Sequence, residues 1–374
     1  MNDRLRADVE HLAAIERGSA SPGEREAAHW IAQRLRALGL AATVEEERVH
    51  PTYWWPIGLL NAIAIAAGAL PGRRARRAVA AASVAALVDD IDHRGRRFRR
   101  LLPKRATYNV TAEHGDRAAE RTVVIVAHHD AAQGGAIFDA RAAEAFARRF
   151  PDVLEGMSRW PQVMWGVVIG PLLLAAGRGR LGTLWSLGAI AAMADIGQSP
   201  VVPGANDNAA AVAVLLQLAE RRYEGVRLIL LSTGSEESNA DGMMEWGRRH
   251  FASLPTQSTA FVALETLGSG HLVISEGEGF LFGHAFDAEL KDRATRCARD
   301  LGVTVWRGLA NAFMSDATPP LNAGYPTMLL GGIDDFRLPA NYHKPWDTPE
   351  KVDYDCVAHA VELLDALVRS FART

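Results

Sequence analysis

Acidic and histidine side chains directly follow most of the strongly apolar runs of this sequence. The run VVIVA is followed by two histidines and an aspartate, LILLSTGS by two glutamates and FVAL by one glutamate. The segments PGANDN and NYHKPWDT contribute an aspartate, and a histidine with an aspartate. In chain order these side chains are His128, His129, Asp130, Asp207, Glu236, Glu237, Glu265, His343 and Asp347.

A set of this kind suggests metal chemistry if the apolar runs are parallel strands, because the carboxyl ends of such strands meet at one edge of the sheet. A single histidine or carboxylate there is usually structural or solvated. Several together would repel and desolvate one another unless cations neutralised them. Zinc accepts both imidazole and carboxylate ligands, and one carboxylate can bridge two ions about 3.5 to 4 Å apart. The pattern therefore predicts a two-metal hydrolytic site.

The order of the motifs is also specific. HxD stands at 128–130, PGAxDN at 203–208, EE at 236–237, a single acid at 265 and YHxxxDT at 342–348. This order resembles the cocatalytic dizinc exopeptidases of metallopeptidase family 28, the group that contains aminopeptidase Y and the glutamate carboxypeptidase II type. The resemblance covers residues 1–50, 106–135 and 200–374.

The resemblance implies a cofactor of two Zn²⁺ ions, or other divalent metal ions, and a ligand for each motif. His128 and Glu265 would hold one ion, Glu237 and His343 the other, and Asp207 would bridge both.

The remaining acids receive supporting roles from the same resemblance. Glu236 would be the general base that takes a proton from the attacking water. Asp130 would orient the His128 imidazole and raise its basicity. Asp347 would help to shape the site from beside His343.

Some features leave alternatives open. Most aminopeptidases of this family have aspartate where this chain has Glu265, and in related dizinc hydrolases the longer acid accompanies carboxypeptidase or acyl-amino-acid cleavage. His129 adjoins the expected ligand His128 and is the alternative ligand, although only His128 makes the HxD spacing.

The elements around these motifs indicate an α/β protein. Apolar runs that read as strands are TYNVTAEH, TVVIVAHHD, VRLILLSTG, TAFVALE, HLVIS and YPTMLLGG. They alternate with helical patterns, so we expect a mostly parallel mixed sheet with helices on both faces. The family resemblance implies that this is the zinc exopeptidase, or phosphorylase/hydrolase-like, fold.

Two apolar segments interrupt the pattern, and each reads as a hairpin with an arginine-bearing tip. Tyr53–Leu70 and Ala78–Val88 flank PGRRARR, while Pro161–Gly177 and Leu181–Ala194 flank RGR. The expected division is a catalytic domain of residues 1–50, 106–135 and 200–374, with insertions at 51–105 and 136–199.

The hairpins have two interpretations. Most of the runs are shorter than the roughly 20 residues that cross a bilayer as a helix, but terminal tryptophans and the basic segment HRGRRFRRLLPKR could meet anionic lipid headgroups. This predicts membrane-surface contact and a membrane-docking cap over the metals. The alternative is an alanine-rich helical subdomain that buries these faces against itself.

Composition narrows the possible partners, metal sites and cellular locations of the protein. With 41 basic and 44 acidic residues the net charge is −3, so nothing favours nucleic acid as a partner. Two cysteines are too few for a thiolate metal site. The charged N-terminus lacks the apolar core of a cleavable signal peptide, so we expect a membrane-associated or cytoplasmic location.

The predicted function is a zinc-dependent exopeptidase that hydrolyses peptide or acyl-amide substrates, with aminopeptidase as the first choice. Carboxypeptidase and N-acyl-amino-acid hydrolase activities are the nearest alternatives. Glutaminyl cyclases resemble the same family and use one zinc ion to cyclise an N-terminal glutamine. A non-catalytic, membrane-associated binding protein on the same fold is the remaining alternative, because fold alone does not establish function.

Overall fold

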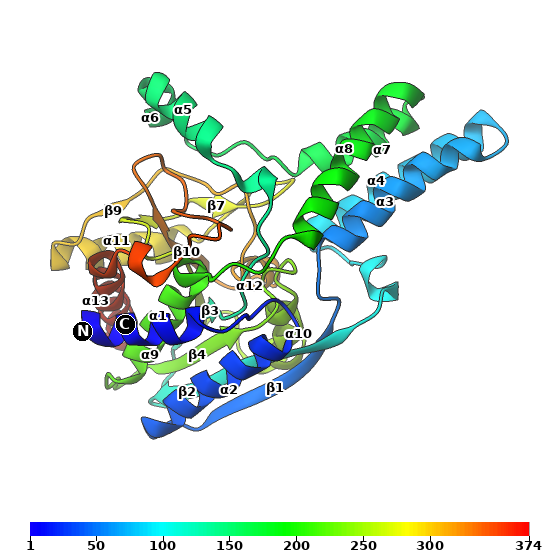
Figure 1. The fold of residues 1–374 in the computed structure, drawn as a ribbon. Coiled ribbons are helices and arrows are strands. Elements are labelled where there is room, and N and C mark those ends of the chain that lie inside the picture. Colours follow the sequence, from blue (N-terminus) through cyan, green and yellow to red (C-terminus); the bar gives the residue numbers. More distant parts are fainter. Residues whose placement is uncertain (374) are drawn as a thin grey trace.

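The computed structural model describes residues 1–373, which are organised around a mixed sheet of eight strands in the order β1-β2-β4-β3-β5-β10-β6-β9 (Figure 1). The strands are β1 Ala42–Val49, β2 Arg105–Gly115, β3 Thr122–His128, β4 Arg227–Thr233, β5 Thr259–Glu265, β6 His271–Ile274, β9 Val305–Trp306 and β10 Thr327–Ile333. A separate ribbon pairs β7 Gly277–Glu278 with β8 His284–Ala285. The central pairs β4–β3, β3–β5 and β5–β10 are parallel, which confirms the predicted α/β class.

Helices cover both faces of the sheet, as the continuous apolar runs predict. On one face lie α1 Asn2–Ala13, α2 Pro22–Ala37, α9 Ala210–Ala219, α11 Ala288–Leu301 and α13 Tyr354–Ser370. On the other face lie α10 Asp241–His250 and α12 Thr318–Asn322. Because side chains alternate along a strand, Val123 and Ile125 of β3 enter the first core while Val124 and Val126 pack with Trp246 in the second.

The two apolar segments form helical hairpins that pack on each other. The first contains α3 Trp54–Ala66 and α4 Arg73–Ile91, and the second contains α7 Trp165–Ala175 and α8 Gly179–Gln198. Helices α3, α4, α7 and α8 together form a projection, here called the arm, that extends away from the sheet (Figure 1). Further along the chain from β3, the short helices α5 Arg141–Arg149 and α6 Pro151–Glu155 form a second, smaller projection.

The arm has a core of its own. Ile57, Leu60, Leu87, Val168 and Met193 are among its buried side chains. Helices α7 and α8 approach each other closely at Gly170 and Ser186. A Cβ atom added to Gly170 would lie 2.2 Å from the Ser186 hydroxyl oxygen, so this approach depends on small residues.

No helix within residues 1–373 combines the length and the apolar character that crossing a bilayer would require.

Candidate metal centre

The carboxyl ends of neighbouring parallel strands bring the predicted residues to one edge of the sheet. His128 ends β3 and Glu265 ends β5, while Glu236 and Glu237 lie in the loop after β4. Asp207 comes from a short helical turn, Ala205–Ala209, that leads into α9. His343 belongs to the loop between β10 and α13. Residues up to 215 positions apart in the chain therefore meet in one buried cluster.

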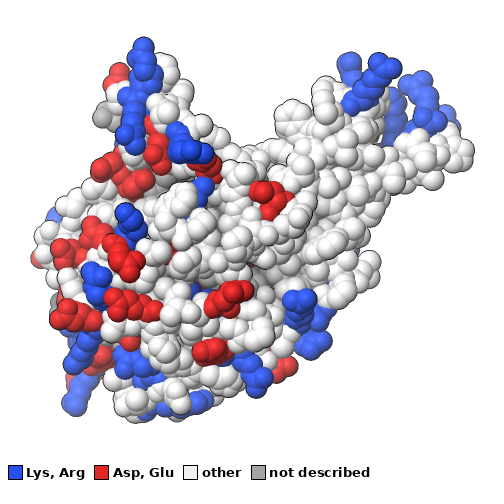
Figure 2. Space-filling view, viewed as in Figure 1, with Lys and Arg blue, Asp and Glu red and all other residues white. Residues whose placement is uncertain are grey.

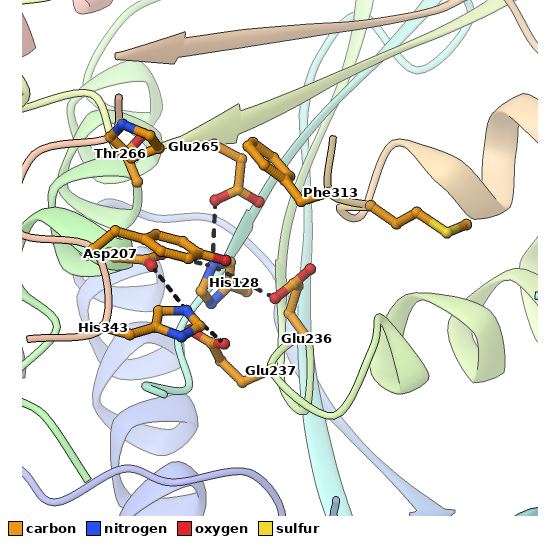
Figure 3. A pocket seen from close by; sticks show the side chains of 11 residues that line it. His128, Asp207, Glu236, Glu237, Glu265, Thr266, Phe313 and His343 are labelled. Atoms are coloured by element: carbon orange, nitrogen blue, oxygen red, sulfur yellow. Dashed lines mark ion pairs between the residues drawn. The ribbon is translucent and has the colours of Figure 1, made fainter. Parts of the chain in front are cut away.

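Asp207 lies between two groups of side chains that point toward one another (Figure 3). Its Oδ1 is 3.4 Å from His128 Nε2, which is also 3.5 Å from Glu265 Oε2. Its Oδ2 is 3.5 Å from His343 Nε2, which is 3.2 Å from Glu237 Oε2. One carboxylate thus presents one oxygen to each group.

These spacings fit tetrahedral metal coordination. Two ligand atoms that each lie about 2.0 to 2.2 Å from a tetrahedral ion are about 3.3 to 3.6 Å apart. His128, Asp207 and Glu265 form one candidate ligand set, and Asp207, Glu237 and His343 form another.

Buried carboxylate oxygens without a partner also fit a site that holds cations. Asp207 Oδ2 and Glu237 Oε1 are buried without a hydrogen-bond partner, as is His343 Nδ1. A buried carboxylate oxygen without a partner is costly, and a divalent ion would provide that partner.

The protein alone destabilises the charged form of the three glutamates in this cluster. Burial raises the pKa of Glu265 to about 8 and also raises the pKa values of Glu236 and Glu237. Neighbouring acids raise them further, because like charges lie within a few ångströms. Cations would reverse this effect, so the donor set suits divalent metal ions.

Asp130 lies behind His128 and holds two parts of the site. His128 Nδ1 is 3.2 Å from the Asp130 carbonyl oxygen and 3.5 Å from its carboxylate. The backbone N–H groups of Glu236 and Glu237 donate to the same carboxylate at 3.0 and 3.1 Å, and the Ser19 hydroxyl donates at 2.7 Å. Asp130 therefore contacts the His128 imidazole and anchors the loop that carries both glutamates.

The turn that carries Asp207 has its own support. The N–H groups of Asn206 and Asp207 each donate to the Asp347 carboxylate at 3.0 Å. The fully buried guanidinium of Arg17 donates to the carbonyl oxygens of Pro203 and Gly204 just before the turn. Asp347 thus acts on the backbone of the bridging residue.

The two histidines after β3 lie on opposite sides of the strand. His129 Nδ1 is 2.9 Å from the Ser232 hydroxyl, and burial lowers the pKa of the ring to about 3. His129 belongs to neither ligand set, whereas His128 faces the cluster. The period of two along a strand explains why only one of two adjacent histidines can point to the site.

Glu236 lines the pocket and lies 3.9 Å from His128 Nε2, farther than Asp207 or Glu265 does. Figure 3 shows its carboxylate beside the cluster. It can also form a ligand set with His128 and Glu237.

Sequence reasoning missed the apolar wall of this pocket. This wall consists of Thr266, Phe313, Met314, Pro339 and Tyr342. Tyr342 adjoins a predicted ligand in the sequence, so its position was detectable. Phe313 and Met314 gave no such signal, since they lie in a loop that only the tertiary fold brings over the metals.

The second insertion does not form the expected cap. The residues that line the pocket in the described part of the chain lie outside 51–105 and 136–199. Residues 165–198 instead pack on the first insertion in the arm and point away from the sheet (Figure 1). Phe138 of this insertion lies beside the site, where its ring packs against the His343 ring at a centroid distance of 4.4 Å.

Part of the basic segment after the first hairpin faces the protein rather than a membrane. Arg96 and Arg99 are each 3% exposed. Both pair with Asp241, and Arg99 also pairs with Asp90 on α4. Their guanidinium groups donate to the carbonyl oxygens at 239 and 238, just after the glutamate pair. The expectation of lipid contact is therefore wrong for these two arginines, because the buried carboxylates pair with them.

This ion-pair network predicts a large stability effect. Replacing Arg99 by glutamine should lower the free energy of unfolding by about 3 to 5 kcal/mol, because Asp90 would keep a buried charge without its partner and Asp241 would lose one of its two. Urea unfolding followed by circular dichroism measures the change. The matched control is Arg97→Gln, which removes an ion pair whose arginine is 82% exposed and should cost less than about 1 kcal/mol. Equal effects of the two replacements would contradict a structural role for the buried network.

Residues 189–368 match the sequence model of peptidase family M28. The matching part contains Asp207, the glutamate pair, the acid at 265 and the histidine at 343. The family resemblance inferred from the motifs is thereby confirmed. A comparison with curated protein sequences gives no match.

Solved structures with a similar fold span almost the whole chain. An aminopeptidase from Aneurinibacillus sp. strain AM-1 has a TM-score of 0.58 at 14% identity, covering 98% of this chain and 93% of the other. A zinc aminopeptidase from Bacillus subtilis, BSAP, has a TM-score of 0.58 at 13% identity, with coverage of 99% and 95%. A glutaminyl cyclase from Porphyromonas gingivalis has a TM-score of 0.55 at 13% identity, with coverage of 99% and 98%. These likenesses establish a shared fold.

Proposed function

Because the chain matches peptidase family M28 over residues 189–368 and has the fold of zinc aminopeptidases, we propose that it is a dizinc aminopeptidase. The observation that carries the proposal is the position of Asp207, which offers one carboxylate oxygen to each of two ligand sets. A hydrolase with a single metal ion would not need such a bridge.

The ligand sets assign the metals. One divalent ion would be held by His128, Asp207 and Glu265, and the other by Asp207, Glu237 and His343. Zinc bound there would polarise the scissile carbonyl and lower the pKa of the attacking water toward neutrality.

The chain's own residues supply the proton transfers. Glu236 takes a proton from the attacking water and delivers it to the leaving amine. Asp130 keeps the glutamate loop and the His128 ring in register during this transfer. The wall formed by Phe313 and Tyr342 receives an apolar side chain and excludes bulk water from the acids.

The charge of the pocket favours the amino end of a peptide. The residues that line it in the described chain include four carboxylates and neither lysine nor arginine. Three of these carboxylates are assigned to the metal ions, which leaves Glu236 to pair with a substrate ammonium, whereas a substrate carboxylate would find no basic side chain among the lining residues. This favours an aminopeptidase over a carboxypeptidase or an N-acyl-amino-acid hydrolase.

A substrate panel tests this polarity. We expect aminoacyl anilides with a free amine and an apolar side chain to be hydrolysed at least about 100-fold faster than their N-acetylated forms, because acetylation removes a charge-assisted interaction. The measurement is kcat/KM with the zinc-loaded enzyme. Faster cleavage of N-acylated or carboxy-terminal substrates would reverse the assigned polarity.

Metal content separates hydrolysis from the cyclase alternative, which the structural likeness to the glutaminyl cyclases supports. We expect about two zinc ions per chain. Dialysis against EDTA should remove both ions and the hydrolytic activity, and added zinc should restore both, as followed by mass spectrometry of the metal. One ion per chain together with pyroglutamate formation from a glutaminyl peptide would support the cyclase.

A further inference from the structure

The outer face of the arm is apolar where a water-exposed helix would normally be polar. Helix α8 buries one face, which includes Ala189, Met193 and Ile196, against the rest of the arm. Its other face exposes Leu181, Leu184, Trp185 and Leu187 by 44 to 69%. Leu70, Leu172 and Ile63 add exposed apolar surface from the neighbouring helices. A helix that is apolar on both faces requires a second apolar environment.

The free end of the arm is strongly basic. The first turns of α4 and α8, together with the residue just before α8, carry six exposed arginines, here called the arginine tip: Arg73, Arg74, Arg76, Arg77, Arg178 and Arg180. Segments 68–78 and 176–182 contain no acidic residue. Arg76 and Arg77 donate hydrogen bonds to backbone carbonyl oxygens. These contacts do not neutralise the positive charge of either side chain. Figure 2 shows the arm with largely uncharged sides and basic side chains at its end.

We propose that the arm docks on the surface of a lipid bilayer that contains anionic headgroups. The outer face of α8 enters the boundary between headgroups and acyl chains, and the arginine tip pairs with lipid phosphates. Leu181 follows Arg180 directly, and Leu184 lies about 4.5 Å beyond Leu181 along the helix. Helices that bind at an interface bury their apolar face by about 5 to 10 Å, and the long arginine side chains can reach back to the phosphates. This contact requires no spanning helix.

A bilayer satisfies both features of the arm, whereas other partners satisfy one. A nucleic acid would pair with the arginine tip but would leave the exposed leucines in water. A second copy of the chain could cover the leucines, but parallel pairing of two arms would bring two arginine tips together. An anionic bilayer offers phosphate and hydrocarbon within the same few ångströms.

Vesicle flotation tests the proposal with the full-length protein. We expect the protein to float with phosphatidylcholine vesicles that contain phosphatidylglycerol, and to bind vesicles of phosphatidylcholine alone at least about tenfold more weakly. Raising the salt concentration should weaken the first interaction, because salt screens exposed charges.

Two variants separate the contributions. Replacing all six arginines of the tip by glutamine should weaken binding to the anionic vesicles at least about tenfold. Replacing Leu181, Leu184 and Leu187 by serine should weaken binding to both kinds of vesicle, because it removes exposed apolar area. These side chains are exposed, so the thermal unfolding temperature of each variant should stay close to that of the parent.

The matched control removes the same number of charges from the body. It replaces six exposed basic residues by glutamine: Arg25, Arg117, Arg222, Arg296, Arg299 and Lys351. Binding by this variant should stay within about twofold of the parent, because these residues lie outside the arm. An equal loss of vesicle binding in the control would mean that the net charge of the protein, and not the arginine tip, determines binding. This result would overturn the proposal.

Two other results would also overturn it. One is a parent protein that fails to float with either kind of vesicle. The other is a parent protein that does not float but forms a dimer in analytical ultracentrifugation, while the leucine variant is a monomer. The apolar face would then bind a second copy of the chain. Both readouts are independent of peptide hydrolysis, so they do not depend on the proposed function.

Discussion

Replacing Glu236 by glutamine is expected to lower kcat by about 10²- to 10⁴-fold while the metal content stays that of the parent. The replacement keeps the size of the side chain and removes the group that exchanges protons with water and the leaving amine. Glu236 lies beside both candidate ligand sets but farther from His128 than the acids we assign as ligands. Steady-state kinetics and metal analysis of the same preparation give the two quantities.

Two further variants make this result interpretable. Glu237→Gln alters an assigned ligand, so it should lower the zinc content as well as kcat. Glu289→Gln changes a side chain that is 82% exposed on α11, and it should leave both quantities unchanged. If Glu236→Gln lost zinc to the same extent as Glu237→Gln, Glu236 would be a ligand and not the base.

Replacing Asp207 by asparagine is expected to have the broadest effect, because this carboxylate contacts both ligand sets. An amide has one acceptor oxygen and no charge, so it cannot neutralise two cations. We expect the zinc content to fall from about two ions per chain to one or none, and kcat to fall at least about a thousandfold. Isothermal titration of the metal-free protein with zinc measures the loss directly.

Asp347→Asn provides a graded comparison for the bridging residue. Asp347 accepts hydrogen bonds from the backbone of Asn206 and Asp207 and belongs to neither ligand set. Its replacement should weaken zinc binding by about 10- to 100-fold, as expected for a group that orients a ligand. Retention of both ions at full affinity in Asp207→Asn would falsify the bridging assignment and with it the two-metal proposal.

The arm touches the candidate site indirectly and does not cover it as the sequence predicted. The arm does not contribute to the lining of the pocket, yet Asp90 near the end of α4 joins the ion pairs that hold the loop after Glu237. A contact made by the arm and the geometry of the glutamate loop therefore share one buried network. The basic run around Arg96 and Arg99 resembled a lipid-binding segment because composition alone cannot distinguish a buried arginine from an exposed one.

The sequence by itself determined the fold class and the set of side chains that meet at the sheet edge. Strand ends such as His128 and Glu265 were predictable because a continuous apolar run defines a buried strand, and parallel strands end at a common edge. The helices of the arm followed from apolar runs separated by arginine turns. These properties are local, so spacing and side-chain chemistry are enough to state them.

Only the tertiary structure decided which residues distant in sequence are in contact. It placed Phe313 and Met314 beside the acids. It also directed the arm away from the pocket and buried Arg99 between Asp90 and Asp241. The physical reason is that loop positions and helix packing depend on contacts between residues distant in sequence, and no short-range pattern records them.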